Sequence, residues 1–473
     1  MNLTLHIRLK SISFRLLSSL LLLGLGSSAN ALGPVEVPET WGGDLTTRQR
    51  LTGDWGGVRD KMAKKGVELD ANMLLMPGGV ITGGKETGAE FWGNVDYTLN
   101  IDTDKLGLWP GGFFKFEGVS SFGNTLYDQV GAIVPNNVAS LYPEFDQASS
   151  GLMQATFTQF LSHQVGVTMG KINLFEFTPA EFYGDYRTQF MNTALNISAA
   201  FAMAPISAYG GGILGLPTPD ITLMALALDA SGTPMENNIS KAFENGVTVL
   251  SAAHFNIKPF GLVGHQGVTG LWSDKTRFSL DQDPENLKRA LLQERYPILG
   301  NPGPRLERIL NKYFPQLIAP VKPANKKSNT WAVVYSFDQY LWQPDADEKR
   351  GIGLFFSFGA TDGNPNPVQY SYMMGIGGKG VFSGRTHDSF GIGWARTQFS
   401  DQFMPLLRDK LALGLDHEDA IEMYYTAAIT PWLNVSPNLQ IIKSGMNKEL
   451  NNSNELQDMD TTLEASLRMN LLF

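Results

Sequence analysis

The sequence predicts an all-β fold: a transmembrane antiparallel β-barrel of about sixteen strands, preceded by a short N-terminal helical segment. Apolar and polar residues alternate along many segments of strand length, as they do when one face of a strand meets lipid and the other meets water. The connections between these segments are alternately short and long. The mean hydropathy is −0.11 and the chain has one long apolar run, at its N-terminus, so a bundle of membrane helices is excluded.

The first 31 residues have the features of a secretory signal peptide. A basic start with three Lys or Arg residues precedes an apolar stretch over 16–25, and small residues at 29–31 offer a cleavage site. The apolar stretch is too short for a membrane anchor. Cleavage would remove no acidic residue and change the formal charge from −9 to −12. An acidic chain is a poor nucleic-acid binder, so no nucleic acid is expected among its partners.

The segment 32–68, expected on the periplasmic side, comes before the first strand and predicts a short helix. Asp54 is suited to cap this helix, Val58 and Met62 would share one face, and Gly66 would end it. The whole chain lacks cysteine, so neither this segment nor the barrel can be held by a disulfide.

The predicted barrel occupies residues 69–473, and its clearest strand is the last one. Within 461–473 the odd positions are almost all apolar and end at Phe473, whereas Glu464 and Arg468 lie on the other face. A closing strand of this kind resembles those of outer-membrane barrels, and an even number of strands is usual there. The expected strands are 69–76, 93–102, 112–121, 152–160, 164–171, 195–203, 220–229, 247–257, 265–273, 329–342, 351–360, 370–381, 389–399, 421–429, 433–443 and 461–473.

Connections on the side of the termini are predicted to be short and those on the other side long, which is the asymmetry of periplasmic turns and extracellular loops. The longest, 274–328, is expected to be extracellular and partly helical. Asp283 and Pro284 would begin one helix, and the apolar residues around Leu306 and Leu310 indicate another. Between 283 and 327 there are nine basic and four acidic residues, and this loop could cover the barrel mouth or fold into it.

Eight short motifs are spread over most of the chain. They are GDWGGVR at 53–59, GKIN at 170–173, FMNTAL at 190–195, GHQ at 264–266, SFDQYLW at 336–342, DGNPNP at 362–367, TPWL at 430–433 and SPNLQ at 436–440. In this order they resemble the OprB-type carbohydrate-selective porins of Gram-negative outer membranes. The resemblance implies a sixteen-stranded barrel that passes glucose and related sugars by passive diffusion. Outer-membrane lipid, lipopolysaccharide and the assembly machinery, acting through Phe473, are the other expected partners.

A sugar pore must replace the water around sugar hydroxyl groups without holding the sugar tightly. Charges and aromatic rings spread along the wall suit this task better than one deep pocket. Strand parity nominates five inward residues as pore-lining: Asp96, Lys115, Glu117, Glu422 and Tyr424. Each of them could instead belong to a wetted barrel wall with no preference for sugar.

The loop expected over 172–194 is rich in charged residues and tyrosine. Such a loop could fold inward and narrow the pore, and Tyr183 and Arg187 are our candidates for pore-lining residues within it. The alternative is an exposed surface loop, and the sequence does not decide between the two.

No cofactor, metal ion or catalytic set is expected. The glycine run at 375–380 fits a dinucleotide-binding pattern, but no helix follows it, so a strand running into a turn is the better interpretation. The histidines do not have the helical spacing of metal ligands. A general diffusion porin without sugar preference is the main alternative, and an enzyme within an outer-membrane barrel or an exported soluble β-protein is less favoured.

Overall fold

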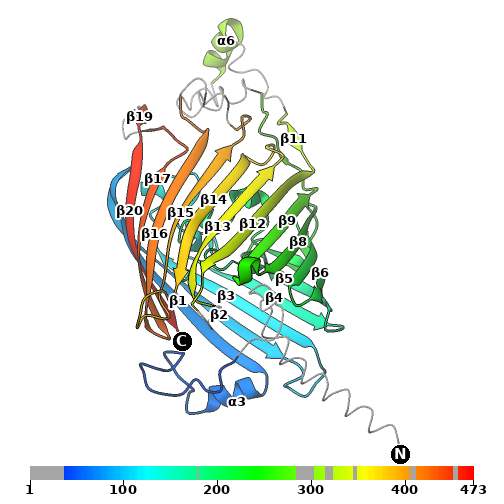
Figure 1. The fold of residues 1–473 in the computed structure, drawn as a ribbon. Coiled ribbons are helices and arrows are strands. Elements are labelled where there is room, and N and C mark those ends of the chain that lie inside the picture. The colour runs from blue at the N-terminus through cyan, green and yellow to red at the C-terminus, as the bar shows by residue number, and fades with distance from the viewer. Residues whose placement is uncertain are drawn as a thin grey trace, which may run out of the picture.

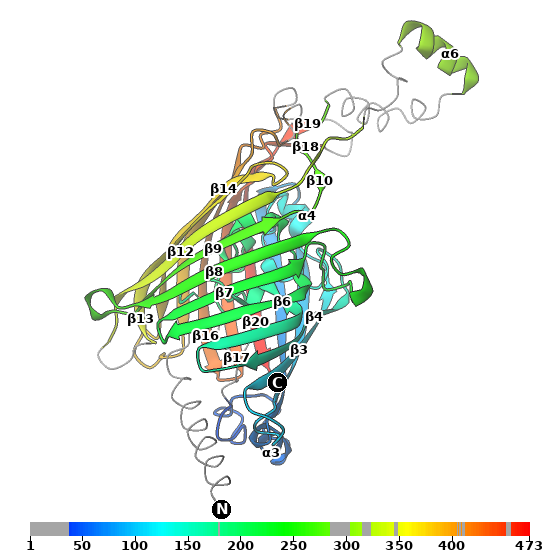
Figure 2. The same cartoon turned by 90° about the vertical axis from the view of Figure 1, so that its right-hand side faces the viewer.

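The computed structural model describes residues 37–177, 180–283, 303–314, 323–344, 349–403, 405, 408, 412–450 and 456–473. Within them sixteen strands close into one antiparallel barrel, in which each strand pairs with its neighbour in sequence and the last pairs with the first (Figures 1 and 2). The predicted signal peptide and the first predicted helix of the 274–328 insert lie outside the described residues. No helix in the described ranges is long and apolar enough to cross a membrane.

The barrel strands are β1 (Val67–Gly84), β2 (Gly88–Asp102), β3 (Gly112–Gly123), β4 (Ser150–Phe160), β5 (Val165–Asn173), β6 (Ser207–Thr218), β7 (Ile221–Asp229), β8 (Val247–Ile257), β9 (Gly264–Ser273), β12 (Thr330–Trp342), β13 (Gly351–Thr361), β14 (Val368–Lys379), β15 (Ser389–Phe399), β16 (His417–Thr430), β17 (Leu433–Lys443) and β20 (Asp460–Leu472). Two short ribbons pair β10 (Arg277–Phe278) with β11 (Lys326–Lys327), and β18 (Lys448–Leu450) with β19 (Leu456–Asp458).

The helices are short. They are α3 (Val58–Lys64), α4 (Tyr127–Val130) and α6 (Pro304–Tyr313), with 3₁₀ turns η1 (Val138–Leu141), η2 (Leu174–Phe177), η3 (Thr193–Leu195), η4 (Ala199–Met203), η5 (Ile239–Lys241) and η6 (Pro259–Gly261).

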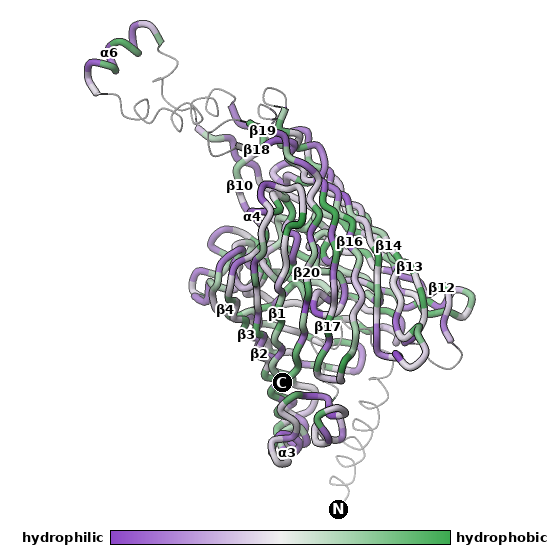
Figure 3. The backbone as a smooth tube through the Cα atoms, turned by 90° about the vertical axis from the view of Figure 1, so that its left-hand side faces the viewer, coloured by the Kyte–Doolittle hydropathy of each residue, from purple (hydrophilic) through white to green (hydrophobic). Residues whose placement is uncertain are grey.

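The predicted alternation of side chains is confirmed on most strands. On β20 the buried positions include Glu464, Arg468 and Asn470, whereas Leu467 between them is exposed on the outer face. The same alternation of hydrophilic and hydrophobic residues is visible along β16 and β20 in Figure 3. Pairing of β1 with β20 closes the barrel, so every backbone group of the wall has a neighbouring strand to bond and no sheet edge is left open.

Fifteen predicted strands overlap an observed one, but the prediction of a strand at 195–203 is wrong. These residues form η3 and η4, and the sixth strand is β6, Ser207–Thr218. Residues 195–203 are rich in apolar side chains because they pack inside the barrel, where Leu195 is fully buried. β6 carries three consecutive glycines, 210–212, and so has no alternation for a pattern search to find.

The short helix predicted in the N-terminal segment is confirmed as α3. Asp54 does not cap it, because Gly57, with a φ of 84°, occupies the N-cap position. Arg59 on α3 lies between the rings of Trp41 and Trp55, at 4.9 and 5.0 Å, and its Nη2 is 2.9 Å from Asp70 Oδ1 on β1. This sandwich fastens α3 beneath the barrel, at the end where the chain terminates (Figure 1).

We call the end of the barrel that carries α3 and the C-terminus the near end, and the opposite end the far end. No connection between barrel strands at the near end is longer than nine residues. At the far end lie the long connections 124–149, 174–206 and 274–329. Helix α6, in the last of these, stands beyond the far end and not inside the barrel (Figure 2).

Candidate functional site

Two of the long far-end connections fold into the barrel: the β3–β4 loop (124–149) and the β5–β6 loop (174–206). On the inner wall, Asn94 Nδ2 donates to the carbonyl oxygens of Ala139, at 3.1 Å, and Tyr142, at 3.3 Å, both in the β3–β4 loop. The two loops also bond each other, since Val138 N donates to Met191 O at 2.8 Å. The inward position of the β5–β6 loop, one of the two alternatives left by the sequence, is therefore the observed one.

Glu181 anchors the first part of the β5–β6 loop to the wall. Its backbone N donates to Asp338 Oδ2 at 3.1 Å, and its Oε1 accepts from Tyr340 Oη at 2.8 Å and from Lys379 Nζ at 2.7 Å. Burial favours the neutral acid, but the ammonium group of Lys379 and the two hydrogen bonds outweigh it and hold the pKa of Glu181 below its ordinary value. His265 Nδ1 lies 2.6 Å from the other oxygen of Asp338 and completes this polar anchor.

Aromatic residues of the loop pack between the anchors. Phe182 lies against Tyr340 with ring centroids 4.8 Å apart, and Phe190 lies against Tyr424 at 4.9 Å. The wall accommodates these rings because it carries glycines opposite them: a Cβ on Gly377 would lie 2.6 Å from Phe182 Cδ1. The glycine run at 375–380 therefore belongs to β14 and the turn after it, and it makes room for the loop.

Arg187 is the charged residue that the β5–β6 loop brings to the opposite wall. Its Nε and Nη2 donate to Asp96 Oδ2 on β2 at 3.0 and 2.6 Å, and Glu117 Oε1 on β3 lies 3.9 Å from Nη2. Burial alone would lower the pKa of Arg187, but the carboxylates, chiefly Asp96, raise it well above its ordinary value. The Arg187 side chain is 26% exposed, whereas both acids are buried, so Arg187 is the member of this cluster that is open to a solute.

The structure thus brings three predicted site residues, Asp96, Glu117 and Arg187, into one cluster. Lys115 lies two residues before Glu117 on the same face of β3, closer to the near end, and is half-buried.

The other three predicted site residues are not open to the pore. Tyr183, Glu422 and Tyr424 are 3%, 0% and 5% exposed. Tyr183, within the β5–β6 loop, packs against Phe355 on β13 with ring centroids 5.1 Å apart, and the loop covers Glu422 and Tyr424 on β16. The expectation that they line the open passage is corrected in this respect. Glu422 instead accepts the backbone N–H groups of Met191 and Asn192, at 2.6 and 2.8 Å, and so fastens the loop.

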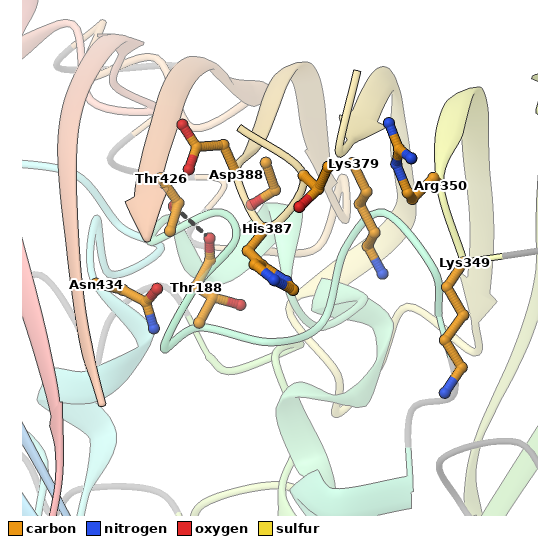
Figure 4. A pocket seen from close by; sticks show the side chains of 10 residues that line it. Thr188, Lys349, Arg350, Lys379, His387, Asp388, Thr426 and Asn434 are labelled. Atoms are coloured by element: carbon orange, nitrogen blue, oxygen red, sulfur yellow. Dashed lines mark hydrogen bonds between the residues drawn. The ribbon is translucent and has the colours of Figure 1, made fainter. Parts of the chain in front are cut away.

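A cavity of about 600 Å³ opens at the near end, next to the tip of the β5–β6 loop (Figure 4). Thr188 O accepts from Thr426 Oγ1 at 2.6 Å and places the loop at its margin. The cavity is lined by Thr188, Lys349, Arg350, Lys379, Thr386, His387, Asp388, Ser389, Thr426 and Asn434.

The sequence analysis did not identify these cavity residues as part of the site. Parity on β14 could have identified Lys379 as inward, but Lys349, Arg350 and His387 lie in near-end turns, where alternation gives no information. Hydroxyl, amide and basic groups predominate in the lining, and these are groups that can exchange hydrogen bonds with a polyol. Among the described residues, no three His, Asp or Glu side chains are grouped so as to hold a metal ion.

The chain is similar to known proteins both in sequence and in fold. The family described as "Carbohydrate-selective porin, OprB family" matches residues 86–469. Porin B of Pseudomonas aeruginosa is 22% identical over 482 residues, covering 95% of each chain. The high-pH structure of Pseudomonas putida OprB has a TM-score of 0.71 and 21% identity, covering 91% of this chain and 100% of that one. The low-pH structure of the same protein has a TM-score of 0.52 and 18% identity, covering 90% and 99%.

Proposed function

The chain belongs to the OprB family of carbohydrate-selective porins, and from this premise we propose that it passes glucose and related small neutral sugars by passive diffusion. It is an outer-membrane β-barrel porin, and its relatives are channel proteins and not enzymes. We propose in addition that the pore prefers glucose and that the residues described above narrow it.

The observation that carries the proposal is the Arg187 cluster together with the cavity beside it. Arg187 presents a partly exposed side chain, and its charge together with that of Lys115, on the same face of β3 as Glu117, balances the charges of Asp96 and Glu117. A balanced cluster offers donors and acceptors to sugar hydroxyl groups and little net field that would favour an ion of one sign. The neighbouring cavity, with Thr188 at its margin, adds hydroxyl, amide and basic groups that can bond sugar hydroxyl groups toward the near end.

The predicted site residues then have two kinds of role. Arg187 and Lys115 are the groups that a passing sugar meets, and the buried carboxylates of Asp96 and Glu117 hold Arg187 in place. Tyr183, within the β5–β6 loop, and Glu422 and Tyr424, on the wall behind it, keep the loop that carries Arg187 in place.

The proposal extends to export and assembly. The signal peptide 1–31 would direct the chain out of the cytoplasm, and the near end of the barrel would face the periplasm. Outer-membrane lipid and lipopolysaccharide would surround the apolar outer face. Phe473, whose backbone N donates to Ala71 O at 2.8 Å, lies at the closing seam of β20 and β1 and would be read by the assembly machinery.

Liposome swelling tests the sugar preference. Vesicles containing the purified protein should swell faster in isosmotic glucose than in isosmotic sodium gluconate, an ionic solute of similar size, because the balanced cluster offers an ion no compensating charge. Protein-free vesicles are the control. Equal swelling rates for both solutes would reject the sugar preference and leave a general diffusion pore.

A further inference from the structure

We propose that two glutamates on β16, Glu418 and Glu422, fasten the two inward loops separately, so that each loop that narrows the pore is held by its own glutamate. The inference depends on the proposed pore only in that the loops narrow it. It does not depend on which solute passes.

Glu418 holds the β3–β4 loop. Its Oε2 accepts from Ile133 N at 2.7 Å and its Oε1 from Val134 N at 2.9 Å. A third bond comes from Gly445 N, at 3.0 Å, in the connection after β17. The side chain is buried, so these backbone groups take the place of water around the carboxylate.

Glu422 holds the β5–β6 loop in the same way. Met191 N and Asn192 N donate to its two oxygens, and Asn438 Nδ2 on β17 also donates to Oε1. Like Glu418, it takes two consecutive N–H groups of one loop, one on each carboxylate oxygen. Side chains four residues apart on a strand share a face and are about 13 Å apart, so one inward row of β16 serves both loops.

Only a carboxylate suits both positions. Each loop offers two backbone donors, and a carboxylate is acceptor-only, with an oxygen for each donor. A glutamine would keep one acceptor and turn an NH₂ group toward the other donor, leaving a buried N–H without its partner. Glu418→Gln and Glu422→Gln therefore change the side-chain volume very little. Each breaks one hydrogen bond to the loop and places the NH₂ group of the glutamine against a backbone N–H, so that two donors face each other.

The two loops are connected to each other, but they are attached to the barrel wall at different places. Gln440 on β17 bridges them, since its Oε1 accepts from Asn192 Nδ2 and its Nε2 donates to Asn136 O, both at 3.0 Å. The β5–β6 loop has a further attachment of its own, where Ser198 Oγ lies 2.6 Å from Ser371 Oγ on β14. This attachment allows the two loops to be distinguished experimentally.

Single-channel recording in potassium chloride measures loop release without any sugar. Each glutamine variant should add a larger conductance level, with its occupancy raised at least about tenfold, because a hydrogen bond to a charged group is lost and another is opposed. Asp419→Asn is the matched control: Asp419 neighbours Glu418 on β16 but pairs with Arg396, at 2.8 Å, and touches neither loop. It should leave the conductance levels unchanged.

A reversible tether shows which loop each glutamate holds. The chain has no cysteine, so Ser198→Cys with Ser371→Cys introduces one disulfide between the β5–β6 loop and the wall. In the Glu422→Gln background, oxidation should lower the occupancy of the larger level and reduction should restore it in the same channel. In the Glu418→Gln background, whose released loop is the other one, the tether should have no effect.

Unchanged conductance in both glutamine variants would overturn the proposal, as would a tether that acts equally in both backgrounds or in neither. Because the tether is switched within folded, conducting channels, loss of folding cannot imitate either result. A failed sugar preference in the swelling assay would leave these conductance predictions as they stand.

Discussion

On β16, β17 and β20 the inner wall of the barrel is polar and carries the two inward loops, whereas on β6, β7 and β8 it is apolar and packs largely on itself. The polar half presents buried hydrogen-bonding groups to the backbone and side chains of the loops: Glu418, Glu422, Gln440, Glu464 and Arg468. The apolar half forms one buried cluster: Ile172, Ala208, Leu214, Leu216, Met224, Leu226, Leu228, Leu250 and Ala252.

The difference shows that an inward side chain need not face water. On the polar half the inward position meets a loop, whose N–H and C=O groups require partners once they are buried. On the apolar half the inward position meets other leucines, and each buried leucine there contributes about 2 kcal/mol through removal of its surface from water. The inward loops are thus held mainly by polar strands, whereas β6, β7 and β8 carry a buried apolar cluster of their own.

A charge in the apolar half should have the largest effect. Leu226→Asp places a carboxylate among buried apolar side chains with no cation beside it, and we expect a loss of about 4 kcal/mol or more in the free energy of unfolding, or failure to fold. Leu226→Ala should lose about 3 kcal/mol through cavity formation.

Urea unfolding in detergent micelles measures both changes. The matched control is Leu223→Ala on the same strand, whose side chain is exposed on the outer face and should contribute about 1 kcal/mol or less. If the two leucine-to-alanine variants are equally stable, β7 has no apolar inner core.

Removing the buried cation of the polar half should come second. Arg468 is fully buried, and its Nη1 donates to Tyr186 O in the β5–β6 loop at 2.7 Å. Arg468→Leu should cost about 3 kcal/mol, because it leaves this carbonyl and the nearby Glu422 without their cation. The change is measured by heating the folded protein and following the loss of its compact, fast-migrating form on a gel. Lys443→Leu, at an exposed position, is the control. A variant as stable as the control would refute the view that this half is held by buried polar contacts.

The partly exposed ion pair of the site should matter least for stability. Lys379 and Glu181 are 32% and 22% exposed, so Lys379→Met should cost about 1 kcal/mol or less. Lys379 also lines the near-end cavity, and its loss should shift the reversal potential of a salt gradient toward cation selectivity. An unshifted reversal potential would mean that ions do not pass this cavity.

The sequence predicts the strands of the polar half better than those of the apolar half. β16 and β20 alternate cleanly, and parity placed Glu422 and Arg468 on the inner face. β6 and β7 have glycine or apolar residues on both faces, so alternation is lost there, and the sixth strand was misplaced onto the apolar residues of the β5–β6 loop. A barrel core and a loop that packs inside a barrel are equally apolar in sequence.

Only part of the candidate site could be predicted from the sequence, because strand parity says which face a residue occupies but not whether a loop covers it. Parity and loop position identified Asp96, Glu117 and Arg187, but burial under a loop depends on how two distant loops fold together. Lys171 is another residue whose burial depends on a distant connection and could not be predicted from strand parity. Gly170, at a φ of 127°, interrupts the alternation, and Lys171 lies over the Tyr209 ring with its Nζ 2.8 Å from Glu236 O in the β7–β8 connection.

The central claim is that a sugar meets Arg187 as it crosses the narrowed pore. Titration of glucose against the single-channel ion current tests it most directly in the wild-type protein and in Arg187→Ala. We predict that glucose reduces the wild-type current in a saturable way, and that the half-saturating concentration rises about tenfold in the variant through loss of a charged hydrogen-bond donor. A current reduction that is non-saturating and identical in both proteins would contradict the account.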